Sequence, residues 1–300
     1  GGSDIYHSIR ISDPDEPLNC MFVLLKADCL LHSQEGKDAW KAVYNEGNRD
    51  AVIFANAPVL EKPSTESFFK IFAQYADMAS KFEAAYVGYS FPHYDNFTVT
   101  DRFSGSGDMV KYSLGDEFLR ATFTDNGRAG EGMFSASVVD FKESLYSDRT
   151  VADYGLESVD SGYYMAYNIV AITAAKDTFI EWEDLLTECL KTLKYSDIFE
   201  NNIRGAIERD FFQARCINQN FNQTMDGIMS SWDSRNKSID IISQKQSDAT
   251  LGYERVYDTR TKEIYRAAKG FTSSYNGKGY KPVTDDNMYT TPISGYIEKD

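Results

Sequence analysis

Between residues 197 and 249, apolar residues recur at steps of three or four positions, which is the spacing of one face of an α-helix. They are Phe199, Ile203, Ile207, Ala214, Ile217, Phe221, Met225, Ile228, Trp232, Ile239 and Ile242. Asp197, with Glu200 three residues later, is typical of a helix N-terminus. We therefore predict a long amphipathic helix over residues 196–249. It either packs along its own sheet or forms a dimer through a protruding part.

Three shorter helices are predicted in the first 195 residues. A weak pattern covers Ser33–Glu46, and a stronger helix begins at Pro63-Ser64. Thr178 and Glu181 have the spacing of a capping box for a helix over Phe179–Leu193. The buried face expected for this last helix consists of Trp182, Leu185, Leu186, Cys189 and Leu193.

Short apolar segments separated by turn residues predict strands. The segments are Asn19–His32 (one or two strands), Ala51–Ala55, Tyr86–Phe91, Phe97–Phe103, Met109–Leu114, Glu117–Thr124, Gly132–Phe141 and Gly162–Ala174. Their close spacing favours an antiparallel meander. The polar residues 1–17 are expected to form a flexible lead-in. Helices around such a sheet give an α+β sandwich over residues 1–195.

The composition changes after residue 250, where seven tyrosines fall among Gly, Thr and Asp. Leu251–Tyr257 and Glu263–Ala268 predict a hairpin with a longer loop, so residues 250–300 are expected to form a small Tyr-rich β unit. A tyrosine offers a flat ring and a hydrogen-bonding tip, which suits ligand binding. The ligand-binding candidates are Tyr275, Tyr280 and Tyr289, and the alternative is that the tyrosines cover the long helix and the sheet.

The formal charge of −15 and the pI near 4.7 make a nucleic-acid partner improbable on electrostatic grounds. No run of 18 apolar residues is present, so no transmembrane segment is expected. Gly1-Gly2-Ser3 is either an expression remnant or the spacer after a removed signal peptide.

The three histidines, His7, His32 and His93, lack metal-ligand spacing, and we expect no metal and no cofactor. His93 lies two residues before Asp95 and is the best catalytic candidate, as a base with its orienting carboxylate. The alternative is a turn at Pro92 with His93 on the surface. Cys20 and Cys29 are either bridged across paired strands or two buried thiols, and the second interpretation is favoured.

Two segments resemble known proteins. Cys189-Leu190-Lys191-Thr192-Leu193-Lys194-Tyr195-Ser196-Asp197 resembles the last helix of the PsbP-like fold, an α-β-α sandwich. Trp232–Ser238, Ser243–Ala249, Gly252–Asp258 and Ile264–Arg266 are similar to the C-terminal part of extracytoplasmic lipoproteins from clostridia-like gut bacteria, a family with no assigned activity. Lys262 stands where those sequences commonly have Gly, which leaves the turn type open.

The second resemblance implies a location outside the cytoplasmic membrane with a lipid anchor. The function expected from the sequence is non-enzymatic binding, with a cell-surface or small-molecule ligand and a monomeric or dimeric state. The alternative is an envelope hydrolase with an unrecognised active site. A pocket containing His93 and a nucleophile would favour the hydrolase, and an aromatic face would favour binding.

Overall fold

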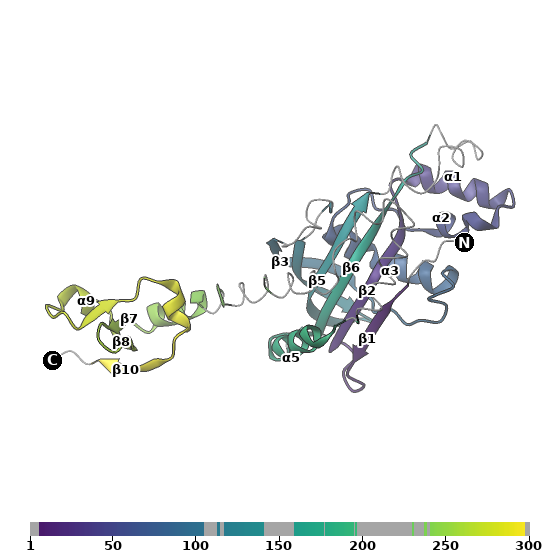
Figure 1. Ribbon diagram of the computed structural model, residues 1–300. Helices are drawn as coiled ribbons and strands as arrows, with labels where there is room; N and C mark the ends of the chain where they lie inside the picture. The colour runs from purple at the N-terminus through teal and green to yellow at the C-terminus, as the bar shows by residue number, and fades with distance from the viewer. Residues whose placement is uncertain are drawn as a thin grey trace. The chain divides into compact units, whose positions relative to one another are not determined.

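The computed structural model describes residues 6–104, 113–114, 117–140, 159–176, 178–194, 196, 230, 237–238 and 241–297. The chain divides into two compact units, residues 1–229 and 230–300, and each is described by itself (Figure 1). The architecture is mixed α+β, as the sequence predicts, and the larger sheet belongs to the first unit.

A six-stranded antiparallel sheet with the order β1-β2-β6-β5-β4-β3 organises the first unit. Its strands are β1 (Ser8–Ser12), β2 (Cys20–Leu31), β3 (Asp95–Ser104), β4 (Glu117–Asp125), β5 (Arg128–Asp140) and β6 (Tyr163–Ala175). Strands β3 to β6 form the predicted meander. The apolar run Asn19–His32 forms one buried strand, β2, between β1 and β6.

A two-residue turn, Asn126-Gly127, joins β4 and β5. Both residues have positive φ angles, 51° and 77°, as a type I′ hairpin turn requires. The glycines of residues 127–132 predict a hairpin loop from the sequence, but only Gly127 lies in the turn, because Gly130 and Gly132 belong to β5 and pair with β4 and β6.

Helix α3 (Thr65–Phe82) covers one face of the sheet. The Oγ atom of Ser64 accepts a hydrogen bond from the backbone N–H of Ser67 at 3.1 Å, which confirms the predicted start. The helix and the sheet share a core of buried aromatic residues, among them Phe22, Phe68, Phe69, Phe72, Tyr75 and Phe134. Ring-to-ring contacts such as Phe69–Phe134, with centroids 4.9 Å apart, connect the two layers.

Helix α5 (Phe179–Thr192) packs on the opposite face. Leu119 and Ala121 belong to the α3 core, so Arg120 between them points to the other side. There its guanidinium lies 5.3 Å from the ring centre of Phe179 and 3.9 Å from the carboxylate of Glu183.

The predicted buried face of α5 is wrong in part. The residues buried along it are Phe179, Glu183, Leu186, Thr187 and Leu190, whereas Leu185 and Cys189 are exposed. Glu183 occupies a buried position because it contacts Arg120. A search for apolar residues at helical spacing does not find the buried face of α5, because that face contains this charged residue. The capping box is also absent, since the Thr178 hydroxyl donates to the Ala175 carbonyl instead of accepting from the helix.

Helices also replace one predicted strand. Ala51–Ala55 lies in η1 (Arg49–Ala51) and α2 (Val52–Asn56), because the Asn48 side chain accepts from the N–H of Asp50 and starts a helical turn. With α1 (Gln34–Asn45), these short helices bury Trp40 and Phe54 against β2 and β6 at one end of the sheet (Figure 1).

Two further expectations are corrected. Tyr86–Phe91 is not a strand, because its backbone makes local turn hydrogen bonds while the rings of Tyr86 and Phe91 enter the α3 core. The expected lead-in contains β1, an edge strand paired with β2. Its polar sequence is compatible with a strand because an edge strand needs fewer apolar residues.

The second unit contains a four-stranded sheet with the order β10-β8-β7-β9. Its elements are β7 (Tyr253–Asp258), β8 (Ile264–Ala268), α9 (Phe271–Ser274), β9 (Tyr280–Pro282), η3 (Asp286–Thr290) and β10 (Ile293–Ile297). The β7–β8 hairpin is the predicted one. Strand β10 runs parallel to β8, and residues 241–250 are helical.

Most of the predicted long helix lies outside the described residues, including Phe221, Met225, Ile228 and Trp232, and so does most of the predicted strand Met109–Leu114. Cys20 and Cys29 are free and buried, as favoured from the sequence. Within the described ranges, no helix has the length and apolar character needed to cross a membrane.

Candidate functional site

Asp95 is the first residue of β3 and His93 precedes the strand by two residues; Asp95 is exposed and His93 is half-buried. In the described part of the chain, no hydrogen bond or ion pair joins them. The residue between them, Tyr94, is buried in the α3 core, and this burial raises its pKa. The structure therefore gives the pair no base–orienter contact.

A different histidine lies between two carboxylates. The Nδ1 atom of His32 is 3.0 Å from Oδ1 of Asp160, and its Nε2 atom is 3.2 Å from Oδ1 of Asp140. Only 5% of the His32 side chain is exposed, against 41% for Asp140 and 45% for Asp160. The ring of Tyr164 covers the imidazole with centroids 4.1 Å apart, and burial followed by the two carboxylates raises the pKa of Tyr164.

Backbone contacts fix this arrangement where β2 ends and α1 begins. The N–H of His32 donates to the carbonyl of Gly162 at 3.1 Å, and the Trp40 indole donates to the carbonyl of Ser161 at 3.1 Å. A Cβ atom on Gly36 would lie 2.3 Å from the carbonyl oxygen of Asp160. The first turn of α1 can approach residues 160–162 so closely because residue 36 is a glycine.

The chemistry of the His32 cluster differs from that of a hydrolase. The contact of Nδ1 with Asp160 resembles that of a base with its orienting carboxylate. In a hydrolase the other nitrogen faces a hydroxyl or a thiol, whereas Nε2 of His32 faces the carboxylate of Asp140. That 3.2 Å contact is an ion-pair distance without the direction of a hydrogen bond, since Nε2 is buried with no hydrogen-bond partner.

Sequence reasoning missed this cluster. His32 ends an apolar run and lies 128 residues from Asp160, so no short motif connects them. The one local signal is Asp160-Ser161-Gly162 before a predicted strand, which by itself indicates a turn.

A shallow groove lies between the first turn of α3 and the edge strand β3. Its volume is about 500 Å³, and it is lined by Glu66, Lys70, Phe97, Thr98, Val99, Thr100, Asp101 and Arg102. Glu66 accepts hydrogen bonds from Lys70, at 2.6 Å, and from Arg102. These two bonds, Lys70 first, hold the pKa of Glu66 below its ordinary value. Because these charges already satisfy one another, the groove has little charge left for an ionic ligand.

In the second unit, the three candidate tyrosines do not form one face. Tyr275 and Tyr280 pack with Phe271 and Tyr265 against Val256 of β7. Tyr289 stacks on the guanidinium of Arg255, 4.7 Å from its ring centre. Arg255 and Val256 are neighbours in a strand, so their side chains point to opposite faces of the sheet. The ligand-binding candidates are therefore divided between two faces.

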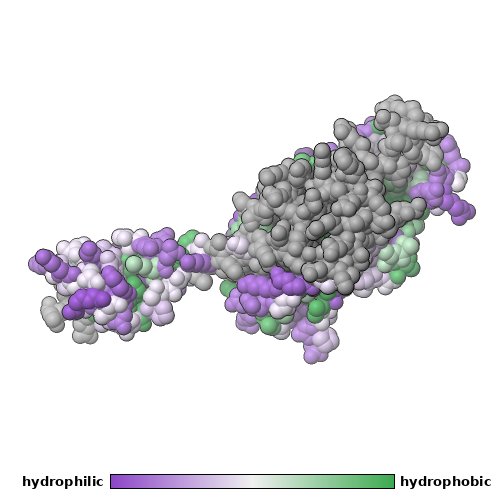
Figure 2. All heavy atoms as spheres, viewed as in Figure 1, coloured by the Kyte–Doolittle hydropathy of each residue, from purple (hydrophilic) through white to green (hydrophobic). Residues whose placement is uncertain are grey.

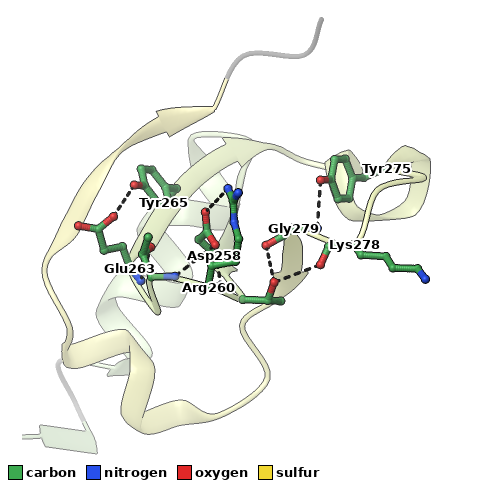
Figure 3. Close-up of polar contacts among 9 residues, drawn as sticks. Asp258, Arg260, Glu263, Tyr265, Tyr275, Lys278 and Gly279 are labelled. Atoms are coloured by element: carbon green, nitrogen blue, oxygen red, sulfur yellow. Dashed lines mark hydrogen bonds and ion pairs between the residues drawn. The ribbon is translucent and has the colours of Figure 1, made fainter.

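Four exposed cations belong to the hairpin loop and to the adjoining segment 278–281, and we call Arg260, Lys262, Lys278 and Lys281 the basic tip. The hydroxyl of Thr259 donates to the carbonyls of Lys278 and Gly279, each at 3.1 Å, which joins the two loops (Figure 3). Lys281 is paired with Tyr257 across β9 and β7, and the Nζ atom of Lys262 lies 5.7 Å from the ring centre of Tyr257. Arg260, Lys262, Lys278 and Lys281 are exposed.

The carboxylates next to the basic tip are engaged inside the unit. Asp258 accepts from the backbone N–H of Arg260 at 2.8 Å and from its side chain at 3.4 Å, and these bonds lower the pKa of Asp258 (Figure 3). Glu263 accepts from the hydroxyl of Tyr265 at 2.7 Å. Asp258 thus pairs with Arg260 of the basic tip, whereas Lys262, Lys278 and Lys281 are exposed to solvent.

The two units also differ in charge. Residues 230–300 contain 11 Lys and Arg and 10 Asp and Glu, a formal charge of +1. Residues 1–229 contain 20 and 36, a formal charge of −16. On the face seen in Figure 2, the second unit is mainly purple and white, the colours of hydrophilic and intermediate residues. The acidic character of the chain thus belongs to the first unit.

Among the residues that the structure describes, no three or more His, Cys, Asp or Glu side chains gather as a metal site. Comparisons of the chain with protein-family models, with curated proteins and with solved structures found no match.

Proposed function

We propose that this chain is a non-enzymatic binding protein of the bacterial cell envelope, and that its second unit contacts the ligand. The observation that carries the proposal is the basic tip, in which three exposed lysines lie beside tyrosines and Arg260 is paired with Asp258, in a chain of charge −15. Such a surface suits a polar or anionic ligand, because lysines attract it and tyrosine rings offer a flat contact.

The location rests on the sequence resemblance to extracytoplasmic lipoproteins, which covers part of the second unit. We infer from it a position outside the cytoplasmic membrane, with a lipid anchor. We also propose that the first unit is PsbP-like. Its antiparallel sheet between α3 and α5 supports this assignment, because a PsbP-like fold has helices on both sides of a sheet.

Binding is tested by sedimenting the full chain with purified Gram-positive cell walls. A variant with Lys262→Ala, Lys278→Ala and Lys281→Ala should bind about 10-fold more weakly, since three favourable charge contacts are lost. The matched control replaces three exposed lysines of the first unit, Lys41, Lys81 and Lys176, and should bind as the wild type does. A wild-type chain that stays in the supernatant would contradict the proposal.

The hydrolase alternative gains no support from either histidine. His93 has no bond to Asp95, and Nε2 of His32 faces Asp140 rather than a nucleophile. The same wall suspension tests it, because hydrolysis would release soluble fragments over time. Release that stops in the His32→Gln variant would favour the hydrolase over the binding protein.

A further inference from the structure

We propose that one face of the second sheet binds a neutral oligosaccharide, and that the residues which contact it are Tyr265, Tyr275, Tyr280, Arg260 and Glu263. We call these residues the tyrosine face. The inference rests on the proposed function, because it names the class of ligand that the second unit takes from the cell wall. It is carried by a row of half-buried rings with hydrogen-bonding groups beside it.

The pairing of the strands places the rings on one face. Tyr265 of β8 lies opposite Val256 of β7, and Tyr280 of β9 lies opposite Asp258. Residues 256 and 258 point to the same side of β7, so Tyr265 and Tyr280 share that side. Their ring centres are 6.2 Å apart, and the ring centre of Tyr275 is 5.6 Å from that of Tyr280. The three rings therefore form a continuous row with Tyr280 in the middle.

Contacts at their hydroxyls hold two of the rings in place. The Tyr275 hydroxyl accepts from the backbone N–H of Gly279 at 3.3 Å, and a Cβ atom on Gly277 would lie 2.3 Å from it. The loop closes around this hydroxyl because residue 277 is a glycine. The Tyr265 hydroxyl donates to Oε2 of Glu263 at 2.7 Å. Rings that are ordered before binding lose little conformational entropy when a ligand covers them.

Arg260 supplies hydrogen-bond donors beside the row. Its side chain is 79% exposed, whereas that of Asp258, which it contacts at 3.4 Å, is 6% exposed. Asp258 first, and then Tyr280 and Tyr275, raise the pKa of Arg260, so the guanidinium lies near both rings. Figure 3 shows it between Tyr265 and Tyr275. A guanidinium has five N–H donors, and the contact with Asp258 uses one, so donors remain for a ligand.

The balance of charge favours a neutral ligand at this face. Arg260 is paired with Asp258, and Glu263 adds a second carboxylate, so the three groups have a formal charge of −1. An anion would be repelled there. The guanidinium donates hydrogen bonds and Glu263 accepts them, and the hydroxyls of a sugar need both kinds of partner. The C–H side of a sugar ring packs on a tyrosine ring as other apolar surfaces do.

The competing ligand is a proline-rich peptide, which also packs on aromatic rings. Proline has no N–H to donate, so Glu263 would lose contact with water without gaining a donor. A sugar hydroxyl supplies that donor. The lysines of the basic tip are not part of the tyrosine face, and they remain for anionic groups of the same polymer.

The test uses the full chain and short soluble oligomers of glucose and of N-acetylglucosamine, with the tyrosine ring signals followed by NMR. At least one oligomer should shift the signals of Tyr265, Tyr275 and Tyr280. Arg260→Ala removes an exposed charged donor and should weaken this binding about 10-fold. Tyr280→Phe removes one hydroxyl and should weaken it about 5-fold.

The matched controls are Lys269→Ala, an exposed cation of the same unit, and Tyr257→Phe, a tyrosine on the opposite side of β7. Both should bind the oligomer as the wild type does. The proposal is overturned if no neutral oligomer binds, or if the controls weaken binding as much as Arg260→Ala does. It is also overturned if only a proline-rich peptide or a glycerol phosphate polymer shifts the three tyrosines.

Sedimentation with cell walls separates this failure from that of the proposed function. A chain that sediments with walls but binds no neutral oligomer remains a wall-binding protein, and only the ligand named here is wrong. A chain that does not sediment with walls contradicts the proposed function itself.

Discussion

Asp248 and Arg255 form a buried ion pair in the second unit, with Nε of Arg255 2.5 Å from Oδ2 of Asp248. The two side chains are 5% and 1% exposed. The other oxygen of Asp248 accepts from Nε of Arg266 at 3.0 Å. The carboxylate of Asp248, in the helical segment 241–250, thus pairs with one arginine of β7 and one of β8. These two ion pairs hold the segment against the β7–β8 hairpin.

Asp248→Ala should destabilise the second unit strongly, because it leaves the guanidinium of Arg255 buried without a counter-charge. The expected cost is roughly 3–5 kcal/mol, the range for breaking a buried pair by removing one partner. Hydrogen exchange of β7 and β8 in increasing urea measures it. Asp286→Ala, which breaks the exposed pair with Lys245, should cost less than about 1 kcal/mol. Equal effects of the two substitutions would contradict the role of Asp248.

Lys262→Gly should stabilise the hairpin. Lys262 has a φ of 65°, in the left-handed region that glycine adopts more readily than lysine. Relief of the left-handed conformation is worth about 1–2 kcal/mol, and the larger freedom of glycine in the unfolded chain offsets part of it, so a gain of roughly 0.5–1 kcal/mol remains. Lys269→Gly, an exposed lysine without positive φ, should destabilise, and denaturant midpoints compare the two.

The stability of the first unit should depend on pH through Glu66. Hydrogen bonds from Lys70 and then Arg102 hold its pKa below the ordinary value of 4.5. A depressed pKa in the folded state adds stability above the unfolded pKa, and this stability is lost as the pH falls through the folded pKa. The Glu66 side chain is 23% exposed, but its partners Lys70 and Arg102 are 51% and 48% exposed, so solvent screens the pairs and we expect less than about 1 kcal/mol. Between neutral and acidic pH, the urea midpoint of the wild type should fall as Glu66 becomes protonated. This part of the pH dependence should disappear in Glu66→Gln and remain in the control Glu61→Gln.

Two glycines of β5 should differ in their tolerance of alanine. A Cβ atom on Gly132 would lie 2.5 Å from the carbonyl oxygen of Ile172, whereas on Gly130 it would lie 2.4 Å from the ring of Phe123. The backbone of β6 cannot move away without breaking the sheet, but a ring can turn. Gly132→Ala should therefore cost about 1–3 kcal/mol and Gly130→Ala less. The midpoint of thermal unfolding of each variant measures these costs. A larger cost for Gly130→Ala than for Gly132→Ala would show that the Phe123 ring is the more rigid neighbour.

The sequence by itself determined the elements that depend on near neighbours. The spacing of Phe68, Phe72 and Tyr75 with a cap at Ser64 specifies α3, because the period and the cap act within a few residues. Asn126-Gly127 specifies the turn of the β4–β5 hairpin for the same reason, since both residues tolerate positive φ.

Only the tertiary structure decided which face of α5 is buried and where β1 lies. The α5 face depends on the meeting of Glu183 with Arg120 of another element, and β1 is a strand because β2 offers it an edge. The His32 cluster likewise exists only because the sheet brings the end of β2 to the end of β5 and the start of β6. Local patterns record a residue's own helix or strand face, whereas a buried charge is stable only beside partners that lie far along the chain, and the fold alone supplies them.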